Sequence, residues 1–72
     1  QDLKQAKNWI AKAIEMDSDK YWMYHQQSLI LAELNEKDAA IAAAKSSLKL
    51  AEEAGNQDYV RLNKKFIEKW SQ

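Results

Sequence analysis

Residues 39–56 read AAIAAAKSSLKLAEEAGN and give the clearest indication of how this chain folds. Alanine has the highest helix propensity, and its small side chain lets a neighbouring helix approach closely. The segment therefore predicts a helix over residues 37–54 that packs tightly on its neighbours. Gly55 is the only glycine and stands where a helix can end in the left-handed conformation. Asn56 is a suitable cap for a further helix over residues 57–70.

The sequence before residue 37 predicts two more helices. Apolar side chains recur at spacings of three and four over residues 2–16, and a similar stripe follows over residues 20–34. Asp17-Ser18-Asp19 interrupts the pattern and offers N-cap side chains for the second helix, and Asn35 can end that helix in the left-handed conformation. Because short turns make consecutive helices antiparallel, we expect an all-α domain of helical hairpins over residues 1–72.

Composition excludes several functional classes. The 72 residues carry 11 Lys plus Arg and 11 Asp plus Glu, whereas a nucleic-acid-binding domain needs a basic excess, so we expect no nucleic-acid partner. No run of about 18 apolar residues predicts a membrane span. The polar start, Gln1–Gln5, does not resemble a signal peptide. With one His, no Cys and scattered carboxylates, we expect no metal site or other cofactor.

The chain repeats itself with a period of 34 residues. The pairs aligned at that offset are Ala6 with Ala40, Ile10 with Ala44, Ala13 with Ser47, Ile14 with Leu48 and Met16 with Leu50. One additional residue near Gly55 aligns Tyr24 with Tyr59, Ser28 with Asn63 and Leu31 with Phe66. Self-similarity at such a period is typical of stacked helical hairpins, each of which buries its apolar face against its neighbours.

The segment YVRLNKKF, residues 59–66, resembles the first-helix motif of the tetratricopeptide repeat family. That motif has Trp, then Leu-Gly, then Tyr, and here Tyr59, Leu62, Asn63 and Phe66 stand at those positions. The second helix follows the motif less well, since Gln27 stands where Leu is usual. The resemblance implies a fragment of an α-α superhelix whose first helices line a concave, peptide-binding groove.

By register, the resemblance implies a set of groove residues on the second and fourth helices. On the second helix they are Trp22, His25, Gln26, Leu29 and Glu33, and on the fourth they are Val60, Arg61 and Lys64. The implied function is a non-enzymatic interaction module, or scaffold, that binds a protein or peptide. We expect Trp22, His25, Gln26, Leu29, Arg61 and Lys64 to contact the partner. A second interpretation of Trp22 is that it packs under a terminal helix.

Residues 39–60 also look like the helical C-terminal tail of certain exported bacterial proteins of unknown function. This resemblance implies a periplasmic or exported protein, whereas a cytoplasmic one is expected otherwise. It also implies an alternative function, that of a structural cap or homodimerisation tail of a larger protein. Trp9 and Met16 lie beside the main apolar stripe of the first helix and are the candidate association face; Trp9 can instead pack under the second helix.

An enzymatic hypothesis rests on His25 and Ser28, which are one helical turn apart. A nucleophile also needs an orienting acid and an oxyanion hole, and a continuous helix offers no spare backbone N–H groups for the latter. We therefore expect the chain not to be an enzyme, with His25 on the surface and Ser28 as a packing contact.

Overall fold

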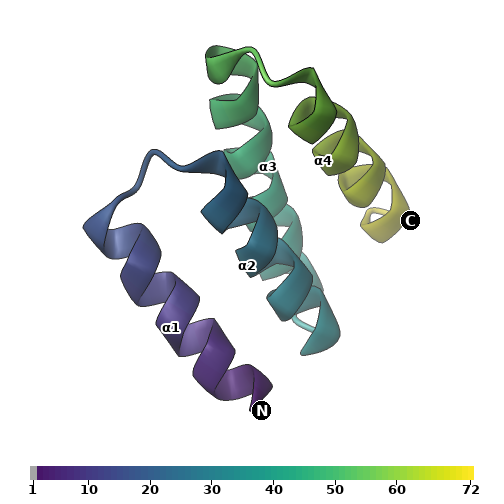
Figure 1. The fold of residues 1–72 in the computed structure, drawn as a ribbon. Helices are drawn as coiled ribbons and strands as arrows, with labels where there is room; N and C mark the ends of the chain where they lie inside the picture. Colours follow the sequence, from purple (N-terminus) through teal and green to yellow (C-terminus); the bar gives the residue numbers. More distant parts are fainter. Residues whose placement is uncertain (1) are drawn as a thin grey trace.

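The computed structural model describes residues 2–72 and contains four helices: α1 Leu3–Met16, α2 Tyr21–Glu33, α3 Lys37–Ala54 and α4 Gln57–Trp70 (Figure 1). No strand occurs between residues 2 and 72, so the all-α prediction is confirmed. The predicted helix bounds differ from the observed ones by at most one residue. Successive helices run in opposite directions, as short turns require (Figure 1).

Three helix ends follow the predicted local chemistry. Asn35 and Gly55 have φ values of 62° and 75°, in the left-handed region that ends a helix. Asn56 caps α4, because its side-chain oxygen accepts a hydrogen bond from the backbone N–H of Tyr59 at 3.1 Å. At the start of α1, Asp2 accepts in the same way from the backbone N–H of Lys4.

The predicted capping of α2 by Asp17 or Asp19 is wrong. The N-cap of α2 is Lys20, which makes no side-chain capping bond, and Asp17 is instead the C-cap of α1. The two carboxylates interact with Lys20 at 3.9 and 3.7 Å and with each other. The hydrogen bond between the two carboxyl groups raises the pKa of Asp17 and lowers the pKa of Asp19, and Lys20 lowers both.

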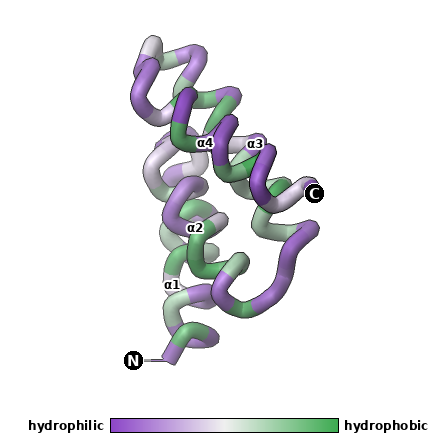
Figure 2. The backbone as a smooth tube through the Cα atoms, turned by 90° about the vertical axis from the view of Figure 1, so that its right-hand side faces the viewer, coloured by the Kyte–Doolittle hydropathy of each residue, from purple (hydrophilic) through white to green (hydrophobic). Residues whose placement is uncertain are grey.

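The alanines of α3 form the centre of the packing. Ala40, Ala44 and Ala51 are fully buried, which allows α2 and α4 to approach the α3 backbone closely. On one side of α3, the side chains of Leu31, Ala32, Ala40 and Ala43 cluster, and Phe66 and Trp70 pack against them. The four helices make a flat body with extents of 32 × 31 × 17 Å. Figure 2 shows hydrophobic and hydrophilic residues alternating along the helices of this layer.

Burial agrees for four of the eight residue pairs aligned by the internal repeat. Ile10 and Ala44 are both buried, and Ser28 and Asn63 are both completely inaccessible to solvent. The other four pairs differ in burial, most clearly at the end of α1, where Met16 is 88% exposed. The internal repeat is therefore reflected only in part in the packing of the two halves.

α2 contacts more of the other helices than any other helix does, and α1 contacts the fewest. α2 contacts each of the other three helices, whereas α1 packs against α2 alone among the helices of residues 2–72. α2 still exposes Trp22 and Leu29 at 45% and 46%. Along the described part of the chain, no helix combines the length and apolar character that crossing a bilayer would require.

Candidate binding groove

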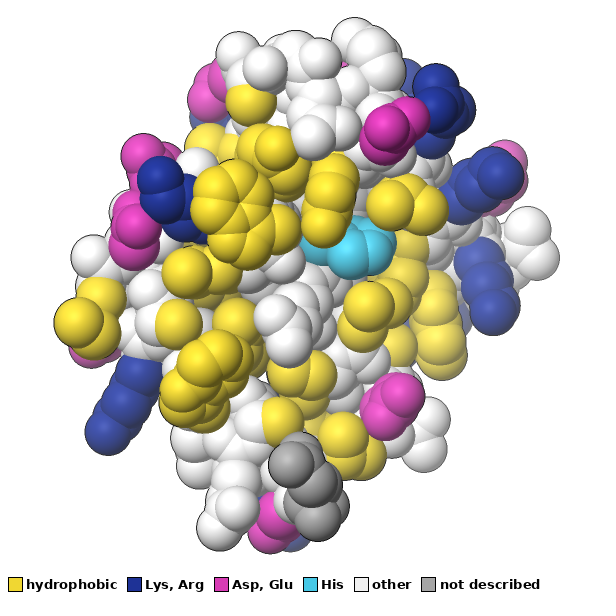
Figure 3. Space-filling model, viewed as in Figure 1, with side chains coloured by type: hydrophobic (Ala, Val, Ile, Leu, Met, Phe, Trp, Pro, Cys, Tyr) yellow, Lys and Arg dark blue, Asp and Glu magenta, His cyan; other side chains and the backbone are white. Residues whose placement is uncertain are grey.

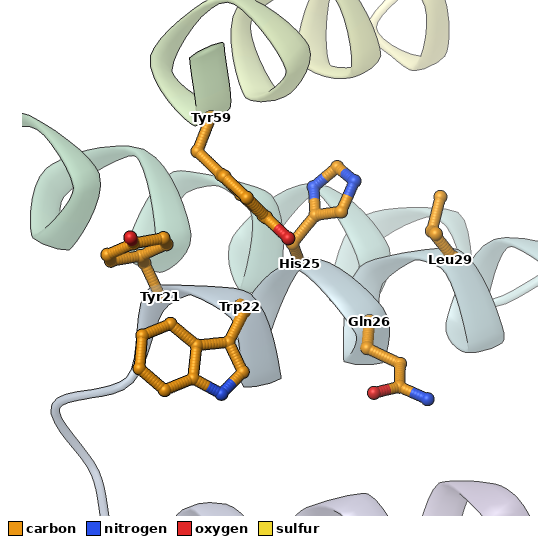
Figure 4. A pocket seen from close by; sticks show the side chains of 6 residues that line it. All are labelled: Tyr21, Trp22, His25, Gln26, Leu29 and Tyr59. Atoms are coloured by element: carbon orange, nitrogen blue, oxygen red, sulfur yellow. The ribbon is translucent and has the colours of Figure 1, made fainter. Parts of the chain in front are cut away.

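A groove of about 670 Å³ lies between α2 and α4. Its lining residues are Tyr21, Trp22, His25, Gln26, Leu29 and Tyr59, and we call it the aromatic groove (Figure 4). His25 and Leu29 extend from α2 on the side of α4, whereas Trp22 and Gln26 extend on the opposite side, away from Tyr59. All six lining side chains are uncharged when His25 is neutral. The structure therefore brings together Trp22, His25, Gln26 and Leu29, four of the six residues predicted to contact a partner.

Edge-to-face contacts fix the rings that form one wall of the groove, which we call the aromatic wall: Tyr21, Trp22, His25 and Tyr59. The ring of Tyr21 lies 5.0 Å from that of Trp22 and 4.9 Å from that of Tyr59, measured between centroids. The imidazole of His25 meets the Tyr59 ring edge-on at 5.4 Å. Such pairs are favourable beyond the area they bury, and they restrict the rotation of each ring. The aromatic wall is therefore preorganised in the free protein.

A cation lies against the outer edge of this wall. The Lys20 ammonium is 5.6 Å from the centroid of the Trp22 ring, within the range of a cation–π interaction. This contact orients the indole, which is nevertheless almost half exposed.

Beneath the aromatic groove, a chain of hydrogen bonds joins α2, α3 and α4. The Ser47 hydroxyl on α3 donates to the backbone carbonyl of Tyr21 at 2.7 Å. Asn63 on α4 donates from Nδ2 to Ser47 Oγ at 2.8 Å, and its Oδ1 lies 2.8 Å from His25 Nδ1. Because Ser47 and Asn63 are completely buried, this network fixes α4 relative to α2 through α3.

The side chains of Ser28 and His25 are not hydrogen-bonded to each other. The Ser28 hydroxyl is buried and donates to the backbone carbonyl of His25 at 2.5 Å, not to the imidazole. The imidazole is bonded through Nδ1 to the amide oxygen of Asn63 and not to a carboxylate. Among residues 2–72 there is also no group of three or more metal-ligating side chains.

Arg61 and Lys64, the other two predicted contact residues, do not line the aromatic groove. Both are exposed on α4, and Arg61 pairs with Asp58 at 2.5 Å. Val60, also assigned to the groove by register, is buried, and Glu33 is exposed outside the lining. The face of α4 that meets α2 carries Tyr59 instead, a residue of the repeat motif that was not among the predicted groove residues.

A second hollow, of about 600 Å³, lies between α1 and α2. It is lined by Asp2, Gln5, Ala6, Trp9 and Gln26. Since Gln26 lines both spaces, the hollow adjoins the aromatic groove. Figure 3 shows hydrophobic side chains across the centre of this face, around the single histidine, with charged side chains mostly at the rim. Trp9 is 64% exposed, so it does not tuck fully under α2.

Comparison with known proteins gives no relative: no family model matches the chain, and no curated protein or solved structure does so.

Proposed function

We propose that this chain is a non-enzymatic protein-interaction module that binds an uncharged, apolar segment of a partner protein in the aromatic groove. The observation that carries the proposal is a groove lined by the exposed side chains of Trp22 and Leu29, in which contacts between the aromatic rings hold them in place. Trp and Tyr are the side chains most often found at the energetic centre of protein interfaces. Their preorganisation lowers the entropic cost of binding.

A tetratricopeptide-like arrangement is part of this proposal. Two observations support it: the aligned pairs Ile10 with Ala44 and Ser28 with Asn63 are each buried on both sides, and α2 and α4 carry corresponding motif positions. In that family the first helices of neighbouring repeats line the peptide groove, and α2 and α4 flank the aromatic groove here. The buried pair of Ser28 and Asn63 occupies the position where the family motif has its small residue.

The Trp22→Ala variant tests this function. A peptide selected against the protein from a displayed library should bind the variant at least about fivefold more weakly, because an interface anchor contributes more than about 1 kcal/mol. Isothermal titration of both proteins with that peptide gives the ratio. Met16→Ala is the matched control, since Met16 is exposed on α1 and lines neither hollow. Equal affinity of the Trp22 variant and the parent would rule out the aromatic groove as the binding site.

Self-association through α1 is a second candidate function, and the exposure of Trp9 and Met16 favours it. If this surface joins two copies, light scattering across a hundredfold concentration range will show a dimer, and Trp9→Asp will convert it to a monomer. If the aromatic groove is the functional surface, the parent protein will be monomeric throughout that range and Trp9→Asp will leave its mass unchanged.

A further inference from the structure

The direction of every hydrogen bond beneath the aromatic groove follows from its first member. The backbone carbonyl of Tyr21 can only accept a hydrogen bond, so the Ser47 hydroxyl donates its single proton to it. Ser47 Oγ must then accept from its other neighbour, which fixes the Asn63 amide with its NH₂ group towards Ser47. The amide oxygen is left facing His25, at 2.8 Å from Nδ1.

This order sets the tautomer of His25. An amide oxygen only accepts, so Nδ1 must carry a proton, and the neutral imidazole then has its lone pair on Nε2. Among residues 2–72, no hydrogen bond to Nε2 occurs. Every buried side-chain nitrogen or oxygen of these residues has a hydrogen-bond partner, so Nε2 cannot be buried. Nε2 is therefore accessible, at the ring that stands between Tyr59 and Leu29 in the aromatic groove (Figure 4).

The other polar groups of the aromatic groove do not select in this way. The Gln26 amide is exposed and offers both a donor and an acceptor. The hydroxyl of Tyr21 accepts from Asn56 Nδ2 at 2.8 Å and keeps its proton available, and the Tyr59 hydroxyl can donate or accept. The indole N–H of Trp22 can only donate, so His25 Nε2 is the one groove atom that combines a fixed orientation with a role restricted to accepting.

We infer that His25 Nε2 is a fixed acceptor through which the aromatic groove selects an apolar ring that carries a hydrogen-bond donor. The ligand class is a neutral peptide segment presenting the indole of a Trp or the phenol of a Tyr, with the ring against Trp22 and Leu29 and the N–H or O–H directed at Nε2. This inference rests on the proposed function and adds to it the chemistry of the bound side chain.

The tautomer is tested first, on the free protein. A long-range ¹H–¹⁵N correlation spectrum of labelled protein, recorded where His25 is neutral, distinguishes the protonated ring nitrogen from the unprotonated one. We expect the unprotonated signal on Nε2, the nitrogen coupled strongly to both ring protons. An unprotonated Nδ1 would overturn the inference.

Selection is tested with two probes that differ in one donor, indole and 1-methylindole. Titration followed by the NMR signals of Trp22 and Leu29 should show indole binding about three- to tenfold more tightly, the effect of one hydrogen bond. His25→Phe keeps a ring at this position and should abolish the preference. If that variant does not fold because Asn63 loses its partner, the double variant His25→Phe with Asn63→Leu replaces both polar groups at once.

The two failures can be told apart. Equal affinities of the two probes, both mapping to Trp22 and Leu29, would overturn the inference and leave the aromatic groove as a binding surface. If neither probe shifts these signals while a selected peptide still binds through Trp22, the inference fails alone. If the peptide also binds independently of Trp22, the proposed function fails with it.

Discussion

Asn63→Ala should lower the free energy of unfolding by about 2–3 kcal/mol. The side chain is completely buried, and it supplies both the donor to Ser47 and the acceptor for His25 Nδ1. Truncation leaves these two partners without their hydrogen bonds and opens a small cavity among three helices. The higher helix propensity of alanine returns only about 0.5 kcal/mol, which is too little to compensate.

Urea denaturation followed by circular dichroism measures this loss, which corresponds to a fall in Tm of roughly 8–24 °C in a domain of this size. Asn8→Ala is the matched control, because Asn8 is exposed on α1 and reports the propensity gain alone. The control should therefore be neutral or slightly stabilising. An Asn63 variant as stable as the Asn8 variant would show that the buried network contributes nothing to the fold.

Ile10→Ala should release α1 from the rest of the molecule. Ile10 is the only buried residue of α1, and α1 packs against α2 alone among the described helices. Truncating a buried isoleucine costs about 2–5 kcal/mol. The ion pair between Lys7 and Glu36, at 2.8 Å, joins two partly exposed side chains and contributes about 1 kcal/mol at most.

Hydrogen exchange locates the effect, because an undocked helix of 14 residues is marginal in water. We expect the amides of α1 to lose most of their protection in the Ile10 variant while those of α3 keep theirs. Leu3→Ala, at a partly exposed position of the same helix, should change protection far less. Equal loss of protection in all four helices would show that α1 unfolds only together with the others.

The features predicted correctly from the sequence are the local ones. Gly55 and Asn35 end helices with positive φ, and Asn56 caps α4, because each effect depends on the residue and its immediate neighbours. Asp17 and Asp19, in contrast, are of a residue type that often caps helices, but neither caps α2. Their carboxylates instead interact with each other and with Lys20, a competition that residue type alone does not reveal.

The candidate site was predicted on one side only. The register carried over from the repeat family gave Trp22, His25, Gln26, Leu29 and Glu33 on α2, and all of these except Glu33 line the aromatic groove. The opposite wall depends on how α4 is rotated against α2, and the register borrowed from the repeat family pointed to Arg61 and Lys64, whereas Tyr59 lines the groove. The bond between His25 and Asn63 spans 38 residues, and no pattern in the linear sequence marks these two as partners.

The three tryptophans stand on three different helices, and their surroundings differ. Trp9 on α1 is largely exposed, Trp22 on α2 is half exposed at the aromatic groove, and Trp70 on α4 packs with Phe66 against the core. Indole fluorescence shifts to longer wavelength with contact to water, so the three emit differently. Variants that keep one tryptophan each would let unlabelled protein report separately on α1 docking, on occupancy of the groove and on the packing of α4.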